Sequence, residues 1–122
     1  MGRVVHFELP AGDTKRAVDF YAKVFGWKFE KWPGPMEYWQ VSTGDAAAPG
    51  INGGLLPGGS TVKSTTNTIE VDSLDAAAAA VKNAGGKQLS PKNAIPGVSY
   101  FAYCEDSEGN IFSVMQNETN AK

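Results

Sequence analysis

The feature that most constrains this chain is a strand–turn–helix pattern that occurs twice along it. The first copy has a β-rich stretch over residues 4–9, a short turn, and an amphipathic run from Thr14 to Phe25. The second copy has a β-rich stretch over residues 66–71 and a helical run from Leu74 to Ala84. Repetition of one folding unit predicts a duplicated architecture with a pocket shared between the copies.

The first copy carries the clearest local signals. Asp13 is a good N-cap for the helix that follows, and Gly26 is the expected left-handed residue at its end. On the preceding strand, alternation places His6 and Glu8 on one face. The opposite face of that strand is apolar and should pack on a helix; it carries Val5, Phe7 and Leu9.

Further strands are predicted from short β-rich runs bounded by glycine and proline, at residues 27–32, 36–43, 51–56, 87–91, 98–105 and 111–116. A flexible connection is expected over residues 57–61, an N-cap at Asp72, a loop over 94–97 and a frayed polar tail over 117–122. The predicted order is βαβββ followed by βαβββ. The predicted fold is therefore a single α+β domain over residues 1–122, with modules at 3–57 and 65–117 and curved mixed or antiparallel sheets around a central cavity.

Composition excludes several classes of function. The 122 residues are 42% hydrophobic and 20% charged, with a net charge of −2, as in ordinary soluble domains. Lysines and arginines are scattered, so neither a nucleic-acid surface nor a polybasic membrane patch is expected. Cys104 is the only cysteine, so no internal disulfide forms, and the first residues lack a signal-peptide core. We expect a cytoplasmic protein.

Several motifs, in order, resemble those of the vicinal oxygen chelate superfamily, which includes glyoxalase I, bleomycin-resistance proteins, extradiol dioxygenases and methylmalonyl-CoA epimerase. Residues 5–8 with 17–27 resemble the opening of the first module, and residues 70–77 resemble that of the second. Residues 84–87 and 106–112 resemble its later signatures. The resemblance covers nearly the whole chain, from about residue 4 to residue 116, and implies the two-module fold.

The resemblance also implies a test for a metal site. Metal-using members hold one divalent ion with four inward side chains, usually His, Gln or Glu. His6 matches the first position, but the other three positions carry Asn52, Gly53 or Gly54, then Thr66, then Ser113. One strong ligand of four predicts no tight metal site, with His6 a weak candidate. A shifted site using His6, Glu8 and Glu70 is the alternative.

Two glutamates are the remaining candidates for acid–base chemistry. Glu8 and Glu70 stand at similar places in the two modules, and a shared cavity would raise the pKa of one of them to that of an acid–base group. The simpler interpretation is that each carboxylate is solvated or ion-paired. No nucleophile motif is present, and Cys104 is expected to be a buried structural thiol. Five aromatic residues are either pocket lining or core: Tyr38, Trp39, Tyr100, Phe101 and Tyr103.

The sequence therefore predicts a protein that binds a small aromatic or hydrophobic molecule, without a catalytic metal or other cofactor. The alternative is a metal-dependent lyase, isomerase or dioxygenase that uses His6 with Glu8 and Glu70. By analogy with short two-module relatives, a homodimer is expected. The catalytic candidates are His6, Glu8 and Glu70, and the predicted ligand-binding set is His6, Glu8, Trp39, Asn52, Thr66, Thr68, Tyr100, Ser113 and Met115.

Overall fold

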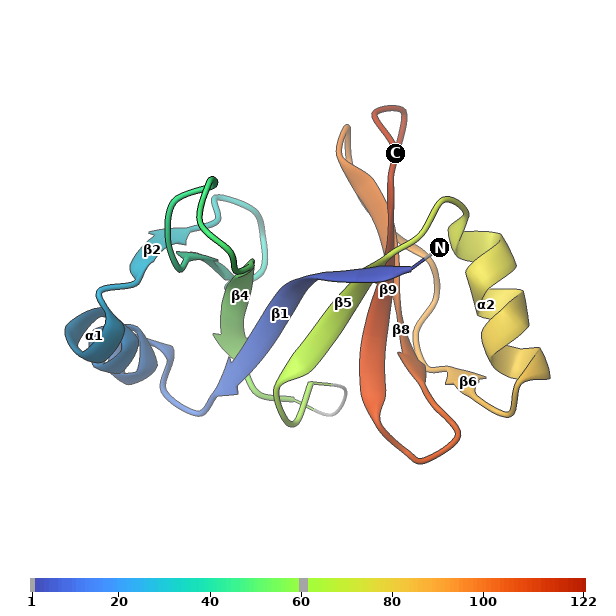
Figure 1. The fold of residues 1–122 in the computed structure, drawn as a ribbon, viewed down its shortest axis with the longest axis horizontal. Coiled ribbons are helices and arrows are strands. Elements are labelled where there is room, and N and C mark those ends of the chain that lie inside the picture. Colours follow the sequence, from blue (N-terminus) through green and yellow to red (C-terminus); the bar gives the residue numbers. More distant parts are fainter. Residues whose placement is uncertain (1, 60–61) are drawn as a thin grey trace. The chain divides into compact units, whose positions relative to one another are not determined.

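Both predicted strand–turn–helix copies form, as a computed structural model of residues 2–59 and 62–122 shows (Figure 1). The chain divides into two compact units. One covers His6–Thr65, and the other combines Thr66–Lys122 with the amino-terminal residues up to Val5. The fold class is α+β, as predicted, and each unit places one helix against a sheet.

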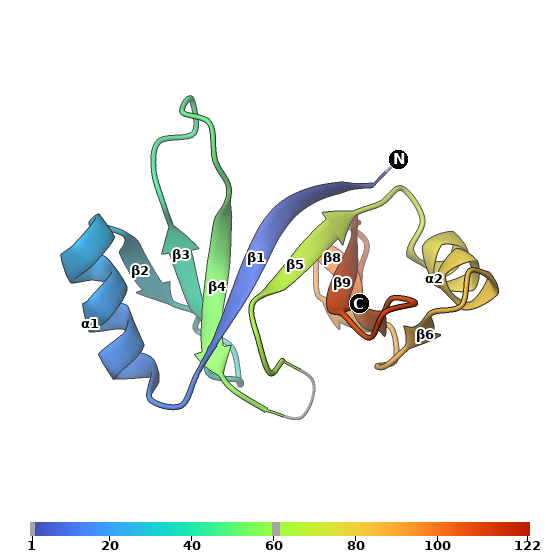
Figure 2. The same ribbon diagram turned by 60° about the horizontal axis from the view of Figure 1, so that its bottom comes forward.

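The unit over His6–Thr65 has a four-stranded mixed sheet in the order β2-β3-β4-β1. Strand β1 runs parallel to β4, whereas β3 is antiparallel to both of its neighbours. Figure 2 shows these strands beside α1. The elements are β1 (Arg3–Ala11), α1 (Thr14–Phe25), β2 (Lys28–Lys31), β3 (Trp39–Ser42) and β4 (Asn52–Pro57).

The predicted helix signals at both ends of α1 are confirmed. Asp13 accepts a hydrogen bond from the Arg16 backbone N–H at 3.0 Å, and Gly26 adopts the left-handed conformation with φ of 72°. Tyr21 stacks on Trp27 with ring centroids 4.9 Å apart, and Phe7 lies 5.8 Å from the same indole. The apolar face of β1 therefore packs on the helical side of the sheet, as its alternation predicted.

The second unit centres on β9, which pairs in parallel with β5 and antiparallel with β8. Strands β6 and β7 both pair antiparallel with β8. Helix α2 covers one face, where the core cluster is formed by Leu74, Ala102, Cys104 and Val114. The elements are β5 (Thr66–Glu70), α2 (Leu74–Asn83), β6 (Lys87–Gln88), β7 (Asn93–Ile95), β8 (Ser99–Glu105) and β9 (Ile111–Asn117).

Cys104 is fully buried in this core, and burial raises the pKa of its thiol. The raised pKa favours the neutral form, which is the form of an unreactive packed thiol. This agrees with the structural role expected for Cys104.

The region between α2 and β8 differs from the prediction. One strand was expected over residues 87–91, but β6 is only two residues long and β7 forms where the predicted loop begins. The cause is a bulge, because the N–H groups of Leu89 and Ser90 both donate to the Tyr103 carbonyl, at 2.8 and 3.3 Å. The Ser90 hydroxyl then accepts from the Tyr103 N–H at 2.9 Å, and Pro91 has no N–H to continue the ladder.

Two further predictions at element ends are wrong. The N-cap of α2 is Ser73 rather than Asp72, since the Ser73 hydroxyl accepts from the Ala76 N–H at 3.2 Å. The tail after β9 is not frayed, because Ala121 is only 4% exposed. The Ala121 carbonyl accepts a hydrogen bond from the Gly97 N–H at 3.0 Å, which holds the tail against the turn before β8.

The linker predicted over residues 57–61 lies partly outside the described residues. Pro57 is the last residue of β4. Among the helices in residues 2–59 and 62–122, neither α1 nor α2 has the length and apolar character needed to cross a membrane.

Candidate functional site

The polar face of β1 is the centre of the candidate site in the unit His6–Thr65. His6 is level with Asn52 of β4, and Glu8 is level with Gly54. Directly paired residues of neighbouring strands project to the same side of a sheet. His6, Glu8, Asn52 and Gly54 therefore share the face opposite to the one that carries Phe7.

Tyr38, the residue immediately before β3, completes this face because its side chain extends across β4 toward β1. Its hydroxyl lies 2.8 Å from His6 Nε2, within hydrogen-bond distance. The ring passes directly over Gly54, where an added Cβ would lie 1.9 Å from the Tyr38 hydroxyl oxygen. Any side chain at position 54 would therefore occupy the space that the phenol now fills.

Burial controls the protonation of His6. Removal of the imidazole from water lowers its pKa, and the nearby Glu8 carboxylate opposes this with a smaller upward effect. Glu8 itself is only 8% exposed, which is rare for a carboxylate outside functional or paired positions. A neutral imidazole beside a buried carboxylate can accept and donate hydrogen bonds and can exchange protons.

The two other predicted site residues of this unit differ in placement: Asn52 shares the face of His6 but its side chain bonds to Thr43, whereas Trp39 lies on the opposite face. The Asn52 side-chain oxygen accepts from the Thr43 N–H at 2.9 Å, so this amide supports the loop between β3 and β4. Trp39 is level with Leu55, which places it on the opposite face from Glu8. Its indole N–H donates to Glu37 at 3.3 Å.

The second unit brings four of the predicted residues to one face. Thr68 is level with Ser113, and the Ser113 hydroxyl donates to the Thr68 hydroxyl at 2.7 Å. Thr66, two residues earlier on β5, is 1% exposed, and Met115 follows Ser113 on the same face of β9. This face is the one opposite to the α2 core.

Tyr100 lies apart from this group, on the face covered by α2. It packs against the core cluster, and the Lys92 ammonium lies 4.3 Å from the centre of its ring. Lys92 also bridges to Asp75 of α2 at 3.3 Å. These contacts tie Tyr100 to the helix side of the sheet.

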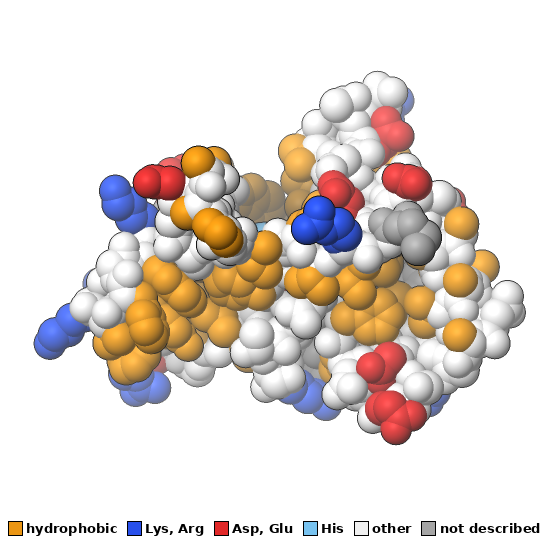
Figure 3. All heavy atoms as spheres, viewed as in Figure 1, with side chains coloured by type: hydrophobic (Ala, Val, Ile, Leu, Met, Phe, Trp, Pro, Cys, Tyr) orange, Lys and Arg blue, Asp and Glu red, His pale blue; other side chains and the backbone are white. Residues whose placement is uncertain are grey.

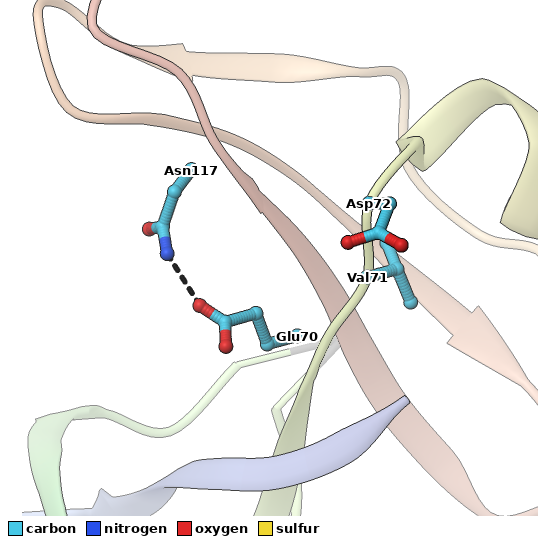
Figure 4. A pocket seen from close by; sticks show the side chains of 4 residues that line it. All are labelled: Glu70, Val71, Asp72 and Asn117. Atoms are coloured by element: carbon cyan, nitrogen blue, oxygen red, sulfur yellow. Dashed lines mark hydrogen bonds between the residues drawn. The ribbon is translucent and has the colours of Figure 1, made fainter. Parts of the chain in front are cut away.

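Glu70 closes the polar face of β5 at its far end. Its carboxylate accepts a hydrogen bond from the Asn117 side chain, and Figure 4 shows the two side chains pointing toward each other. Val71 and Asp72 complete the lining of a cavity of about 290 Å³. Glu70 thus has a hydrogen-bonding partner within its own unit, and this partner is a neutral amide rather than a cation.

The predicted ligand set omits three residues that share the faces described above: Tyr38, Phe101 and Tyr103. Tyr103 is level with Ser113 and Phe101 with Met115, so both share the face of Thr68. The alternation of the β8 strand separates them from Tyr100, and this signal was present in the sequence. Nothing in the sequence indicates that Tyr38 reaches His6, because the contact depends on the register of β3 and β4.

These donors differ from the four-ligand set of metal-using relatives. His6 Nε2 is close to the Tyr38 hydroxyl, Gly54 has no side chain, and the Thr68 and Ser113 hydroxyls bond to each other. Within residues 2–59 and 62–122, no three His, Cys, Asp or Glu side chains are grouped so that they could hold a metal ion. Neutral hydroxyls are weak ligands for divalent transition metals, so the donors of neither unit, taken by itself, fit such an ion.

Comparison with known proteins now adds the family. Residues 3–44 match the family model described as bleomycin resistance protein-like N-terminal. The chain is 34% identical over 125 residues to a glyoxylase-like domain-containing protein of Didymella fabae, and the alignment covers 93% of this chain and 92% of that protein.

Solved structures show the same fold at low identity. A methylmalonyl-CoA epimerase in complex with methylmalonyl-CoA and NH4⁺ superposes with a TM-score of 0.72, at 16% identity, over 100% of this chain and 99% of that chain. The Mycobacterium tuberculosis methylmalonyl-CoA epimerase gives 0.68 at 13% identity, over 94% and 87%.

These likenesses define an α+β protein with a glyoxalase-like and bleomycin-resistance-like domain. The chain belongs to the vicinal oxygen chelate superfamily, as its motifs indicated.

Proposed function

We propose that this chain binds a small aromatic or hydrophobic molecule and does so without a catalytic metal. The observation that supports this most is the polar face of β1, where the 8%-exposed Glu8 lies beside the part-buried His6–Tyr38 pair. Polar groups are costly to bury in a core, so their accumulation on one sheet face favours a binding role over a purely structural one.

The second unit, taken by itself, has another candidate binding face around Thr68 and Ser113, and its side chains suit an aromatic or hydrophobic ligand. Phe101, Tyr103 and Met115 share that face, and side chains of this kind line most small-molecule sites. The few polar groups among them would fix the orientation of the ligand. The proposed ligand-binding residues of this unit are therefore Thr66, Thr68, Phe101, Tyr103, Ser113 and Met115.

A thermal-shift screen of the purified, untagged protein tests the binding proposal. The library holds planar aromatic compounds, glycopeptide antibiotics and, because of the structural neighbours, acyl-CoA thioesters. Ligands of the proposed site should raise the melting temperature of the wild-type protein, and His6→Ala should abolish that rise. Tyr21→Phe, on the α1 side of the sheet, is the matched control and should keep it. No response to any compound would contradict the proposal.

Metal analysis tests the second half of the proposal. The untagged protein is purified without chelators and then titrated with zinc, nickel, manganese and iron. We expect less than stoichiometric metal and no saturable binding that depends on His6. A stoichiometric ion that is lost in His6→Ala would overturn the proposal of a metal-independent site.

The second candidate is an enzyme, and the burial of Glu8 beside His6 favours it. A buried carboxylate next to a neutral imidazole can act as an acid–base pair for a proton transfer next to a carbonyl. Two assays test this alternative: formation of lactoylglutathione from methylglyoxal and glutathione, and epimerisation of methylmalonyl-CoA, the reaction for which the structural neighbours are named. Turnover that is lost in both Glu8→Gln and His6→Ala would establish this alternative.

We also propose a homodimer. Three apolar side chains of α1 are more than half exposed, namely Phe20, Val24 and Phe25, and Figure 3 shows hydrophobic side chains gathered over this helix. Sedimentation velocity of the wild-type protein and of Phe20→Glu tests this, with a monomeric wild-type protein as the contradicting result. The cytoplasmic location stays a prediction.

A further inference from the structure

We propose that Tyr38 is a positioning residue for His6. We also propose that Gly54 makes this contact possible, because the missing side chain at position 54 leaves the space in which the Tyr38 phenol lies. The inference rests on the proposed function, since it assigns residues to the same site. The inference goes beyond the proposed function because it explains how a histidine without companion metal ligands is held in one orientation.

The contact between Tyr38 and His6 fixes the orientation of the imidazole. A lone histidine on a strand has two rotatable side-chain bonds and no inherent reason to keep one orientation. The Tyr38 hydroxyl lies 2.8 Å from His6 Nε2, and the two residues are 32 positions apart in the chain. Metal-binding histidines are fixed by the ion at one ring nitrogen, whereas this nitrogen is instead within hydrogen-bond distance of a phenol.

The absence of a side chain at Gly54 leaves the space that the Tyr38 ring occupies. A Cβ at position 54 would lie 1.9 Å from the Tyr38 oxygen, 2.1 Å from Cζ and 2.7 Å from Cε1. All three nearest atoms belong to the phenol end of one side chain, and the nearest backbone is farther away. An alanine at 54 would therefore displace the tyrosine ring while β4 keeps its pairing with β1 and β3.

Glu8 is the residue of β1 that lies beside Gly54. Gly54 is level with Glu8 on β1, so a residue with a side chain at 54 would face both the phenol and the buried carboxylate. In this chain a glycine stands there, and the aromatic ring of Tyr38 takes the volume.

The test uses the fact that His6 is the only histidine in the chain. Its ring nitrogens give one set of signals in a nitrogen-15 NMR spectrum, and these report tautomer and hydrogen bonding directly. The variants are Tyr38→Phe, which removes the hydroxyl, and Gly54→Ala, which displaces it. The controls are Tyr21→Phe and Gly44→Ala, since a Cβ at Gly44 meets nothing within 4 Å.

We expect both test variants to shift the Nε2 signal in the same direction and the double variant to show no additional shift. The rate at which diethyl pyrocarbonate modifies His6 should rise about fivefold in both, which corresponds to about 1 kcal/mol, the size of one hydrogen bond. The two control variants should keep the wild-type signal and rate.

Unchanged His6 signals in a folded Tyr38→Phe variant would overturn the proposal, and so would additive shifts in the double variant. If Gly54→Ala does not fold, Tyr38→Phe alone decides the question. Neither readout uses a ligand. The experiment can therefore reject the positioning role of Tyr38 without bearing on ligand binding, and the ligand screen can reject binding without bearing on Tyr38.

Discussion

The protonation of His6 follows from its surroundings. Burial lowers its pKa below the ordinary value of 6.5, and the Glu8 carboxylate raises it by a smaller amount. In the unfolded chain the imidazole keeps its ordinary pKa, so below pH 6.5 the unfolded state binds more protons than the native state. The free energy of unfolding therefore rises with pH between the native pKa of His6 and 6.5. Above pH 6.5 His6 is neutral in both states, so the cost of protonating the buried imidazole no longer lowers stability.

A titration of the His6 ring by NMR tests this. We expect a native pKa below 6.5 in the wild-type protein and a still lower pKa in Glu8→Gln, because the variant loses the charge that favours the imidazolium. A native pKa above 6.5, or a rise in the Glu8→Gln variant, would contradict the description of this site.

A second residue-scale prediction concerns the buried hydroxyl pair of β5 and β9. Ser113 donates to Thr68 at 2.7 Å, and both residues are at most 5% exposed. Removing either hydroxyl leaves a buried polar group without its partner, at a cost of about 1–3 kcal/mol. Ser113→Ala combined with Thr68→Val should cost less than the sum of the single variants in chemical unfolding. Additive losses would show that the pair contributes no coupling.

At the scale of elements, one local hydrogen bond determines where α2 begins. The cap bond runs from the Ala76 N–H to the Ser73 hydroxyl, because Leu74 is the first helical residue and Ser73 has an extended backbone. Ser73→Ala should lower the free energy of unfolding by about 1 kcal/mol, and Ser73→Asp should restore most of it. Asp72→Ala is the control and should have a smaller effect, since Asp72 does not cap the helix. A larger loss in Asp72→Ala would contradict this assignment.

The core of the second unit gives another prediction at this scale. Leu74 is 1% exposed and packs with Ala102, Cys104 and Val114 under α2. Leu74→Ala should destabilise the protein by about 2–5 kcal/mol, because the cavity adds to the lost burial. Leu89→Ala is the surface control, since Leu89 is 41% exposed. Equal losses in the two variants, measured by urea unfolding, would contradict the assignment of the core.

At the scale of the whole molecule, the order of elements was readable except for the additional strand β7, because most of that order depends on local signals. Alternation along β1, the cap at Asp13 and the left-handed Gly26 are properties of a few adjacent residues, and the structure keeps all of them. The choice between Asp72 and Ser73 depended on the first helical residue, and the break after Gln88 depended on a serine hydroxyl replacing a backbone partner. Patterns of residue type do not resolve such details.

The candidate site was readable only in part, for a related reason. The shared face of His6 and Glu8 follows from alternation within one strand. The contact of Tyr38 with His6 depends on how three strands are aligned, and the opposite placement of Trp39 follows from the same register. Alternation alone places Tyr100 and Tyr103 on opposite faces of β8. The sequence does not say which of these faces α2 covers, and the structure shows that Leu74 packs on the face of Tyr100.

The central claim is that His6 belongs to a binding site for a small molecule that needs no metal. The most direct test is a thermal-shift screen of wild-type protein and His6→Ala, in parallel and in the presence of a chelator. We predict ligands that stabilise the wild-type protein with chelator present and lose this effect in His6→Ala. Stabilisation that vanishes when the chelator is added, or that persists in His6→Ala, would contradict the claim.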